Sequence, residues 1–234
     1  MVARSIVDEI TDRGYAPGTK LPPERDMVER YGVGRGTLRE SLRFLELTGV
    51  IVMRAGPGGG PIVAAPDAQD FAGLLGLFLQ LNPTPFGAVI QARQVLEPAI
   101  AGLAARNATP ELLQVLADNI ESMERFIDDE QSFLIDNDQF HEAVATAAGN
   151  PLFSLLTASL HRITDGMTLG VDYPLSRRKA VLAAHRRIYE AVERRDAEAA
   201  EAAMYQHMDE FRKYVKKTFP KVQDRFLRWT DIAP

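Results

Sequence analysis

Residues 21–63 read LPPERDMVERYGVGRGTLRESLRFLELTGVIVMRAGPGGGPIV, and this stretch decides the fold of the first part of the chain. Two prolines after Leu21 suit the start of a short helix, because proline has a fixed φ and lacks the N–H that a first turn leaves unpaired. Gly32 ends this helix, and a second helix is predicted over residues 34–48. Gly49 follows at a position where glycine commonly closes a helix. The stretch therefore predicts two short helices joined by a tight turn.

The second predicted helix has two unlike faces. Its apolar side chains have the spacing of a core-facing helix and are Leu38, Leu42, Leu45 and Phe44. Its other face carries arginines four residues apart, with Thr37 near the N-terminus; the arginines are Arg35, Arg39 and Arg43. Guanidinium groups in this arrangement suit the phosphates and guanine edges of a DNA major groove.

A strand pair follows the second helix. Residues 50–54 and 61–65 predict a β-hairpin, and its tip contains Gly56 and the glycines at 58–60. A tip with few side chains can approach a nucleic-acid backbone closely. Helix, turn, helix and hairpin together predict a winged helix-turn-helix that binds DNA. The alternative is an ordinary helical hairpin with a solvated arginine face.

Composition limits the class of protein to which the chain can belong. A chain of 234 residues with 46% hydrophobic and 25% charged residues is globular and long enough for two domains. No stretch reaches the ~18 apolar residues that cross a bilayer, and the absence of cysteine fits a reducing cytoplasm. Residues 1–66 hold nine basic and eight acidic residues, whereas the remainder holds 18 and 24, which gives the net charge of −5. Binding to DNA must therefore depend on where the arginines lie.

The rest of the chain predicts helices alone. They cover residues 68–81, 85–106, 109–129, 131–148, 151–170, 174–195 and 196–217, after a first helix at 3–13. The fold class is mainly α, with an N-terminal winged helix-turn-helix followed by an all-α helical bundle. The expected domains are the DNA-binding head at 1–66, a linker with a connecting helix at 67–84, the helical domain at 85–220 and a C-terminal tail at 221–234.

Histidines mark a second candidate site, and the four are His141, His161, His185 and His207. His185 and His207 lie on two arms of a predicted helical hairpin, at nearly equal height above its turn at ~1.5 Å per residue. Asn137 and His141 share a helical face. Imidazoles with an oxygen ligand suit zinc, nickel or manganese. Spacing alone does not decide which histidines bind the metal, because His161 can reach the level of His141. The alternative is that the histidines are ordinary core or surface residues that bind no metal.

The first stretch resembles the DNA-binding head of the GntR family of bacterial transcription regulators. The match includes the LPPER start, the GV-x-R-x-T-x-R-E-x-L second helix and the glycine before the wing. The resemblance implies DNA contacts by Arg25, Arg35, Thr37, Arg39 and Gly56. The family usually has Ser or Thr on both sides of the first recognition arginine, where this chain has glycines. Either the affinity is lower, or backbone N–H groups at the helix N-terminus take over the phosphate contact.

Two further segments resemble the FCD domain of the FadR subfamily. They are NDQFHEAVATAAGNPLF at 137–153 and AHRRIYEAVERRDAEAAEAAMYQHM at 184–208. The resemblance implies a divalent metal held by Asn137, His141, His185 and His207, which leaves His161 out. Zinc is expected first, with nickel or manganese as alternatives. Many members have Asp at the position of Asn137, and a neutral amide oxygen binds a metal more weakly. Asp138 is expected to point elsewhere.

Arg93 lies in QARQVLEPAIAGLAA, which resembles the helix that lines the effector pocket in this subfamily. A guanidinium facing a metal would bind a small carboxylate effector. The alternative is a surface ion pair between Arg93 and Glu97, four residues later on the same helix.

The sequence thus predicts a cytoplasmic, homodimeric transcription regulator that is not an enzyme. It is expected to be a repressor that reads a palindromic operator in double-stranded DNA and binds a small organic acid at a metal, away from any membrane. One rival is a metal-dependent enzyme. It is disfavoured because Glu142, which faces away, is the only acidic side chain expected near His141 or His185. The other rival is a metal-free regulator that binds an acyl or other hydrophobic effector.

Overall fold

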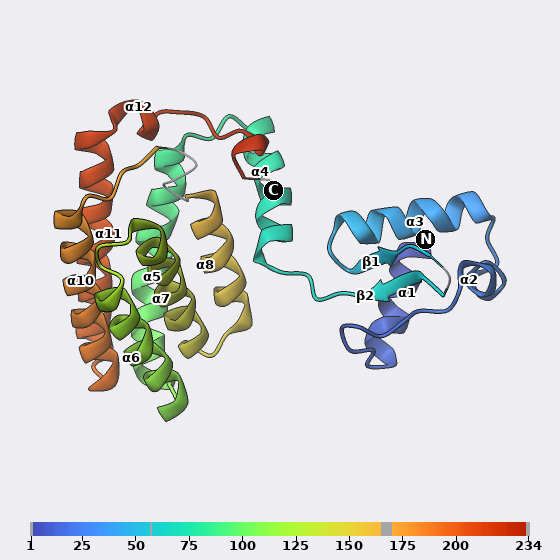
Figure 1. Cartoon of the computed structure of the whole chain (residues 1–234), viewed down its shortest axis with the longest axis horizontal. Helices are drawn as coiled ribbons and strands as arrows, with labels where there is room; N and C mark the ends of the chain where they lie inside the picture. Colours follow the sequence, from blue (N-terminus) through green and yellow to red (C-terminus); the bar gives the residue numbers. More distant parts are fainter. Residues whose placement is uncertain (1, 57, 165–169, 233–234) are drawn as a thin grey trace. The chain divides into compact units, whose positions relative to one another are not determined.

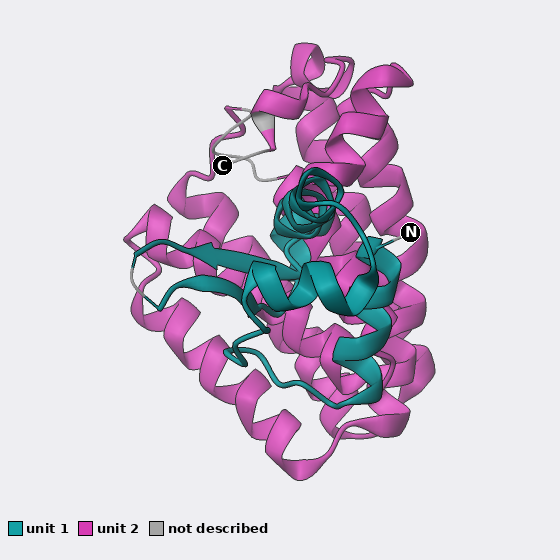
Figure 2. Ribbon diagram, turned by 90° about the vertical axis from the view of Figure 1, so that its right-hand side faces the viewer, with its two compact units in different colours: residues 1–71 teal, residues 72–234 magenta. Residues whose placement is uncertain are grey.

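The computed structural model describes residues 2–56, 58–164 and 170–232. The chain divides into two compact units, residues 1–71 and 72–234, which are coloured separately in Figure 2. The division falls inside one helix, α4 (Ala68–Leu81). Each unit has its own hydrophobic core.

The first unit is a winged helix-turn-helix, as predicted (Figure 1). Its elements are α1 (Val2–Asp12), α2 (Glu24–Tyr31), α3 (Arg35–Leu47), β1 (Ile51–Arg54) and β2 (Gly60–Val63). The strands are antiparallel, with Ile51 opposite Val63, and both side chains are buried. The core residues of α3 are Leu38, Leu42 and Leu45. Phe44 is 57% exposed, so its predicted place in the core is wrong. A helical residue directly before a buried one turns by ~100° and leaves the apolar stripe.

The chain just after the C-terminal end of α3 packs closely against the first turn of α4. Gly49 has a φ of +71°, and a side chain at this position would collide with the carboxylate of Asp70. Asp67 caps α4, because its Oδ1 accepts hydrogen bonds from the N–H groups of Gln69 (2.8 Å) and Asp70 (3.1 Å). The predicted helix at 68–81 is therefore confirmed, and Asp67 marks its start.

The second unit is a bundle of helices. They are α5 (Phe86–Asn107), α6 (Pro110–Arg125), α7 (Glu130–Ala147), α8 (Pro151–Ile163), α10 (Leu175–Glu193), α11 (Ala197–Thr218) and α12 (Pro220–Gln223). Side chains of Thr109, Asn150 and Asp196 cap α6, α8 and α11, which explains why the sequence breaks at these points. α6 ends four residues earlier than predicted, at Arg125 rather than 129. α8 ends at Ile163, and residues 165–169 of the helix predicted to 170 lie outside the described residues.

The C-terminal tail binds to α4, to the segment after it and to the start of α5. The Phe86 N–H donates to the Arg225 carbonyl at 2.9 Å, and the Leu227 N–H donates to the Thr84 carbonyl at 3.1 Å. Further along, the N–H of Trp229, the first residue of the 3-10 turn η1 (Trp229–Asp231), donates to Oε1 of Gln80 at 2.7 Å. Leu227 is buried. The tail is thus part of the helical unit.

Helix α5 packs against α7, α8, α10 and α11. Its buried residues include two charged ones, Arg93 and Glu97, in an otherwise apolar set. All four histidines are buried in the same unit. Among the described residues, no helix is both long and apolar enough to cross a membrane.

Candidate metal and effector site, and the DNA-binding surface

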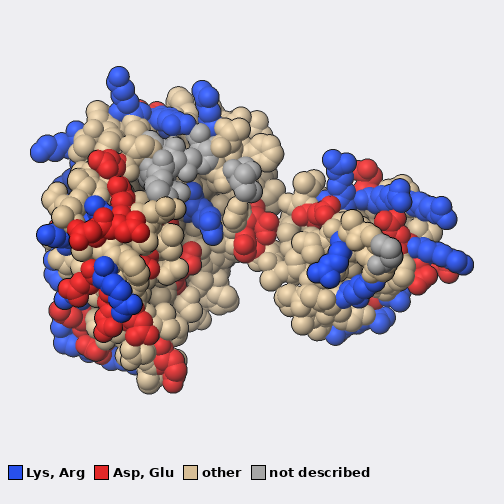
Figure 3. Space-filling model, in the orientation of Figure 1, with Lys and Arg blue, Asp and Glu red and all other residues tan. Residues whose placement is uncertain are grey.

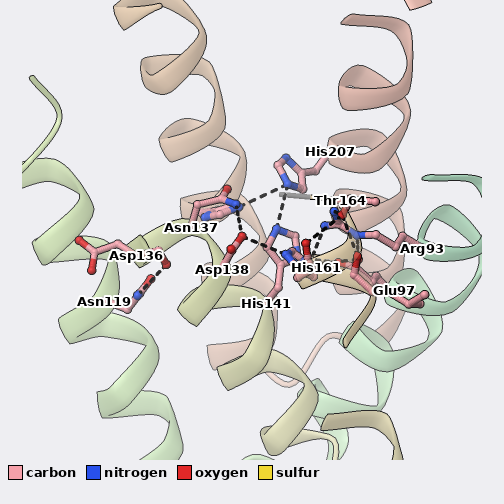
Figure 4. A network of polar contacts seen from close by, with 12 residues as sticks. Arg93, Glu97, Asn119, Asp136, Asn137, Asp138, His141, His161, Thr164 and His207 are labelled. Atoms are coloured by element: carbon pink, nitrogen blue, oxygen red, sulfur yellow. Dashed lines mark hydrogen bonds and ion pairs between the residues drawn. The ribbon is translucent and has the colours of Figure 1, made fainter. Parts of the chain in front are cut away.

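Three imidazoles from three helices converge on one point. His141 comes from α7, His185 from α10 and His207 from α11. Nε2 of His207 lies 3.3 Å from Nε2 of His185 and 3.3 Å from Nε2 of His141. Figure 4 shows the rings of His207 and His141 directed toward each other. Two nitrogens bound to one tetrahedral zinc at ~2.0–2.1 Å are ~3.3–3.4 Å apart, so the spacing suits a shared ion.

The hydrogen-bonding capacity of these rings also favours an ion. Each neutral imidazole has one N–H and one acceptor nitrogen. The Nε2 atom of His207 cannot form good hydrogen bonds with both neighbouring Nε2 atoms at once. A cation at the centre would satisfy the three lone pairs together. The residues present therefore fit a divalent metal.

Asn137 lies one turn before His141 on α7 and lines the same cavity. Its Nδ2 donates to Oδ1 of Asp138 at 3.1 Å, so its amide oxygen is the atom available to a metal. Asp138 lines the cavity too, and its Oδ1 accepts from Nδ1 of His161 at 3.1 Å. The expectation that Asp138 points elsewhere was wrong, because α8 supplies a partner that draws the carboxylate inward.

Glu97 corrects a second expectation. Its Oε2 lies 2.5 Å from Nδ1 of His141, and its Oε1 accepts from Nε of Arg93 at 2.6 Å. The pair with Arg93 is buried and not on the surface, and an acidic group does lie beside His141. By accepting the Nδ1 hydrogen, Glu97 turns the Nε2 lone pair of His141 toward the other imidazoles. A useful sign was available in the sequence, where Glu97 stands in the apolar run from Val95 to Ala105.

Burial and charge set the ionisation of these groups. Burial lowers the pKa of His185 and His207 well below the usual value, and lowers that of His141 to about 4. Burial would raise the pKa of Glu97, but Arg93 and two histidines hold it well below its usual range. At neutral pH the three rings are neutral and Glu97 is charged, which is the state that binds a cation.

Arg93 is fully engaged by protein atoms. Besides its bond to Glu97, its Nη1 donates to Oγ1 of Thr164 at 2.7 Å, and its Nη2 lies 2.6 Å from Nε2 of His161. Burial and Arg93 lower the pKa of His161, but Glu97 and Asp138 outweigh them and raise it. His161 therefore belongs to the Arg93 network and not to the group of three converging rings, although its ring centroid is 4.4 Å from that of His141.

A cavity adjoins the imidazoles. The space open to the centre of a water molecule is about 30 Å³, which is room for an ion and one or two waters. An organic acid would need side chains to move. The lining residues are Arg93, Leu134, Asn137, Asp138, His141, Thr164, Tyr173, Arg177, Val181, His207, Met208 and Phe211.

The role of Glu97 is testable by Glu97→Gln. We expect zinc affinity to fall by about 10–100-fold, the usual effect of removing a carboxylate that orients a ligating histidine. Competition with a chromophoric chelator measures the affinity. Glu142→Gln is the matched control, since it removes a charge next to His141 along the chain but outside the cavity lining. Equal zinc affinity in Glu97→Gln and wild type would contradict the orienting role.

The DNA-binding candidates lie on the surface of the head. Arg25 on α2, Arg35, Thr37 and Arg39 on α3, and Gly56 at the wing tip are all exposed. Figure 3 shows basic side chains gathered over α3 on this face, interspersed with acidic ones. Nε of Arg39 donates to Oε2 of Glu24 at 2.9 Å, so Arg39 must exchange this partner to contact a base.

Two local features bear on the same surface. Gly34 caps α3 without a side-chain hydrogen bond, which leaves first-turn N–H groups for a phosphate. The sequence analysis missed Lys20, whose Nζ donates to the carbonyl of Gly58 in the wing. Leu21, the next residue, donates its N–H to the carbonyl of Pro61 in β2, so this segment is held beside the wing. In the sequence, the signal for this contact was a basic residue directly before the LPPER segment.

A winged helix-turn-helix with exposed arginines, carried on the same chain as a helical domain with a candidate ligand site, is the arrangement of a transcription regulator. Residues 1–59 match the sequence family of bacterial regulatory proteins called the gntR family. Residues 88–210 match the FCD domain family. The chain belongs to the GntR family and carries an FCD domain.

Relatives with established names are regulators as well. The Uxu operon transcriptional regulator of Escherichia coli (strain K12) is 32% identical over 240 residues, which cover 97% of this chain and 89% of that protein. The transcriptional repressor NanR of Citrobacter rodentium (strain ICC168) is 28% identical over 214 residues, covering 89% and 82%. The solved structure of Streptococcus agalactiae GntR has a TM-score of 0.70 at 26% identity and covers 91% of this chain and 97% of its own.

Proposed function

We propose that this regulator is a homodimeric, cytoplasmic repressor of the FadR subfamily whose operator affinity is controlled by a small organic acid bound at a metal. The observation that carries the proposal is the convergence of three buried Nε2 atoms beside a cavity lined by arginines. In this arrangement the metal would accept a carboxylate oxygen of the effector.

The donor set favours zinc. Imidazole nitrogens from His141, His185 and His207 with the amide oxygen of Asn137 would make a four-ligand site without cysteine. Nickel and manganese also accept such ligands. The amide in place of a carboxylate leaves the site one charge more positive, which weakens metal binding and favours an anionic effector.

The head would read a palindromic operator, since a two-fold dimer needs two related half-sites. Arg25, Arg35, Thr37, Arg39 and Gly56 are the proposed contacts. For the effector to matter, it must bind one arrangement of the heads better than another. α4 is the proposed transmission element because its residues belong to both units.

The polar cavity does not suit the metal-free alternative. An acyl effector needs a largely apolar pocket, whereas two arginines, an aspartate and two of the three converging histidines line this cavity beside its apolar side chains. In a metal-free regulator, the three histidines that match the metal ligands of the subfamily would also have no role.

The decisive experiment measures operator binding and its response to metal and acid together. An operator selected from random duplexes is titrated by fluorescence anisotropy with zinc-loaded protein and with chelator-treated protein. We expect the chelated protein to keep operator binding but to lose any response to organic acids, while the zinc-loaded protein loses at least about tenfold in affinity with its effector, a typical coupling. An acid response that survives complete metal removal would refute the metal-based mechanism.

A further inference from the structure

Arg177 lines the cavity and has unused hydrogen-bond donors. It lies in the first turn of α10, and its guanidinium carbon is 4.9 Å from the centroid of the Tyr214 ring. Nε and Nη2 of Arg177 are buried and have no hydrogen-bond partner among the described residues. Buried guanidinium nitrogens without partners are costly. Arg177 lines the cavity, so a ligand bound there would supply the missing acceptors.

The two unpartnered nitrogens form one edge of the guanidinium plane. Nε and Nη2 point the same way, and their N–H groups match the two oxygens of a carboxylate. The guanidinium carbon lies over the Tyr214 ring, a cation–π contact that limits its movement, and the Tyr214 hydroxyl donates a hydrogen bond to the Asp172 carbonyl at 2.6 Å. The fork is therefore pre-oriented.

Arg93 differs from Arg177 in this respect. All three nitrogen positions of Arg93 already contact Glu97, Thr164 or His161. An effector carboxylate could bind Arg93 only by breaking a buried network. Nε and Nη2 of Arg177 have no hydrogen bond to break among the described residues, although other side chains of the cavity would have to move. Arg177 is thus the better anchor, although the sequence analysis singled out Arg93.

The charges around the cavity indicate how many anionic groups it would accept. The arginines at 93 and 177 are balanced by Glu97 and Asp138, and Asn137 adds no charge. A divalent ion on the histidines would then leave two uncompensated positive charges. A dianion would neutralise this excess.

We propose that Arg177 is the second anchor of the effector site and that the effector is a dicarboxylate. One carboxylate binds the metal, and the other accepts hydrogen bonds from Nε and Nη2 of Arg177. This inference rests on the proposed function, because it places the first carboxylate at the proposed metal.

Calorimetric titration of the full-length, zinc-loaded protein tests the inference. The probes are succinate, glutarate and adipate, each paired with the monocarboxylate of equal length: butyrate, valerate and hexanoate. We expect at least one dicarboxylate to bind the wild type about tenfold or more tightly than its partner, the scale of hydrogen bonds to a charged group. Arg177→Gln should remove this preference and leave monocarboxylate binding within about twofold. Arg177→Lys should restore it only in part, because lysine lacks the fork.

Arg178→Gln is the matched control. Arg178 lies next in the same helix and has two buried nitrogens without partners among the described residues, but it does not line the cavity. Arg178→Gln should leave the preference for dicarboxylates unchanged. The comparison with Arg177→Gln therefore separates loss of the anchor from the general effect of removing a buried arginine. Zinc content of each variant, measured by plasma mass spectrometry, checks that the site is intact.

Two results would overturn the inference. One is that no dicarboxylate in the series binds the wild type more tightly than its partner. The other is that Arg177→Gln weakens each pair equally. Failure of zinc loading is a separate result that counts against the proposed function. In that case the same titration on the metal-free protein still tests Arg177, since a dicarboxylate preference there should again disappear in Arg177→Gln.

Discussion

His207→Ala should prevent the protein from holding a stoichiometric metal ion. His207 is the central ring of the three, because its Nε2 lies 3.3 Å from both of the other Nε2 atoms. Removing an orienting carboxylate commonly costs 10–100-fold in metal affinity, and removing a ligand itself should cost more than about 100-fold. Wild-type protein purified without a histidine tag should carry about one zinc, nickel or manganese per chain.

Thermal unfolding gives a second measure of this loss. A metal that binds only the folded state stabilises it by about 2.7 kcal/mol when its free concentration is 100 times Kd. At about 2–4 °C per kcal/mol for a chain of this size, added zinc should raise the Tm of the wild type by about 5–10 °C and leave that of His207→Ala almost unchanged.

Two comparisons test whether the effect of His207→Ala is confined to the metal site. Operator binding without effector should survive, because the head has its own core. Asn137→Asp should change the metal affinity in the opposite direction, since a carboxylate at this position adds a negative charge beside the ion. Equal zinc content in wild type and His207→Ala would rule out the three-histidine site.

Local patterns predicted most of the fold. The apolar spacing of α3, the cap at Asp67 and the breaks at Pro110, Pro151 and Asp196 are effects of neighbouring residues, and a single sequence records them. The approach of His185 to His207 was also predictable, because both lie on one helical hairpin and equal distances from its turn give equal heights.

The charged partners of the histidines could not be predicted in this way. Glu97 contacts a histidine 44 positions away, and Arg93 contacts one 68 positions away, through helices whose mutual packing no local pattern specifies. Asp138 was judged by its own helix alone, although its partner His161 lies on α8. Arg177 has no sequence pattern that distinguishes it from Arg178 beside it, and only the shape of the cavity does so.

Arg35→Ala and Arg39→Ala should each weaken binding to the selected operator much more than binding to random duplex DNA. Both side chains are exposed near the N-terminal half of α3, the part of a recognition helix that contacts base edges. A bidentate contact to guanine is worth about 1–3 kcal/mol of discrimination, or roughly 5–150-fold for each arginine. Arg39 must first leave Glu24, an exposed ion pair worth about 0–1 kcal/mol, so its net effect should be the smaller of the two.

Arg43→Ala is the matched control for these two variants. Arg43 is exposed on the same helix one turn beyond Arg39, where a phosphate contact is the expected role. Its loss should weaken binding to operator and random DNA alike and reduce the slope of log affinity against log salt by about 1. Anisotropy titrations at several salt concentrations separate the two effects. If Arg35→Ala and Arg39→Ala also reduced both affinities equally, these arginines would contact phosphates, and sequence reading would have to come from the wing or from the shape of the DNA.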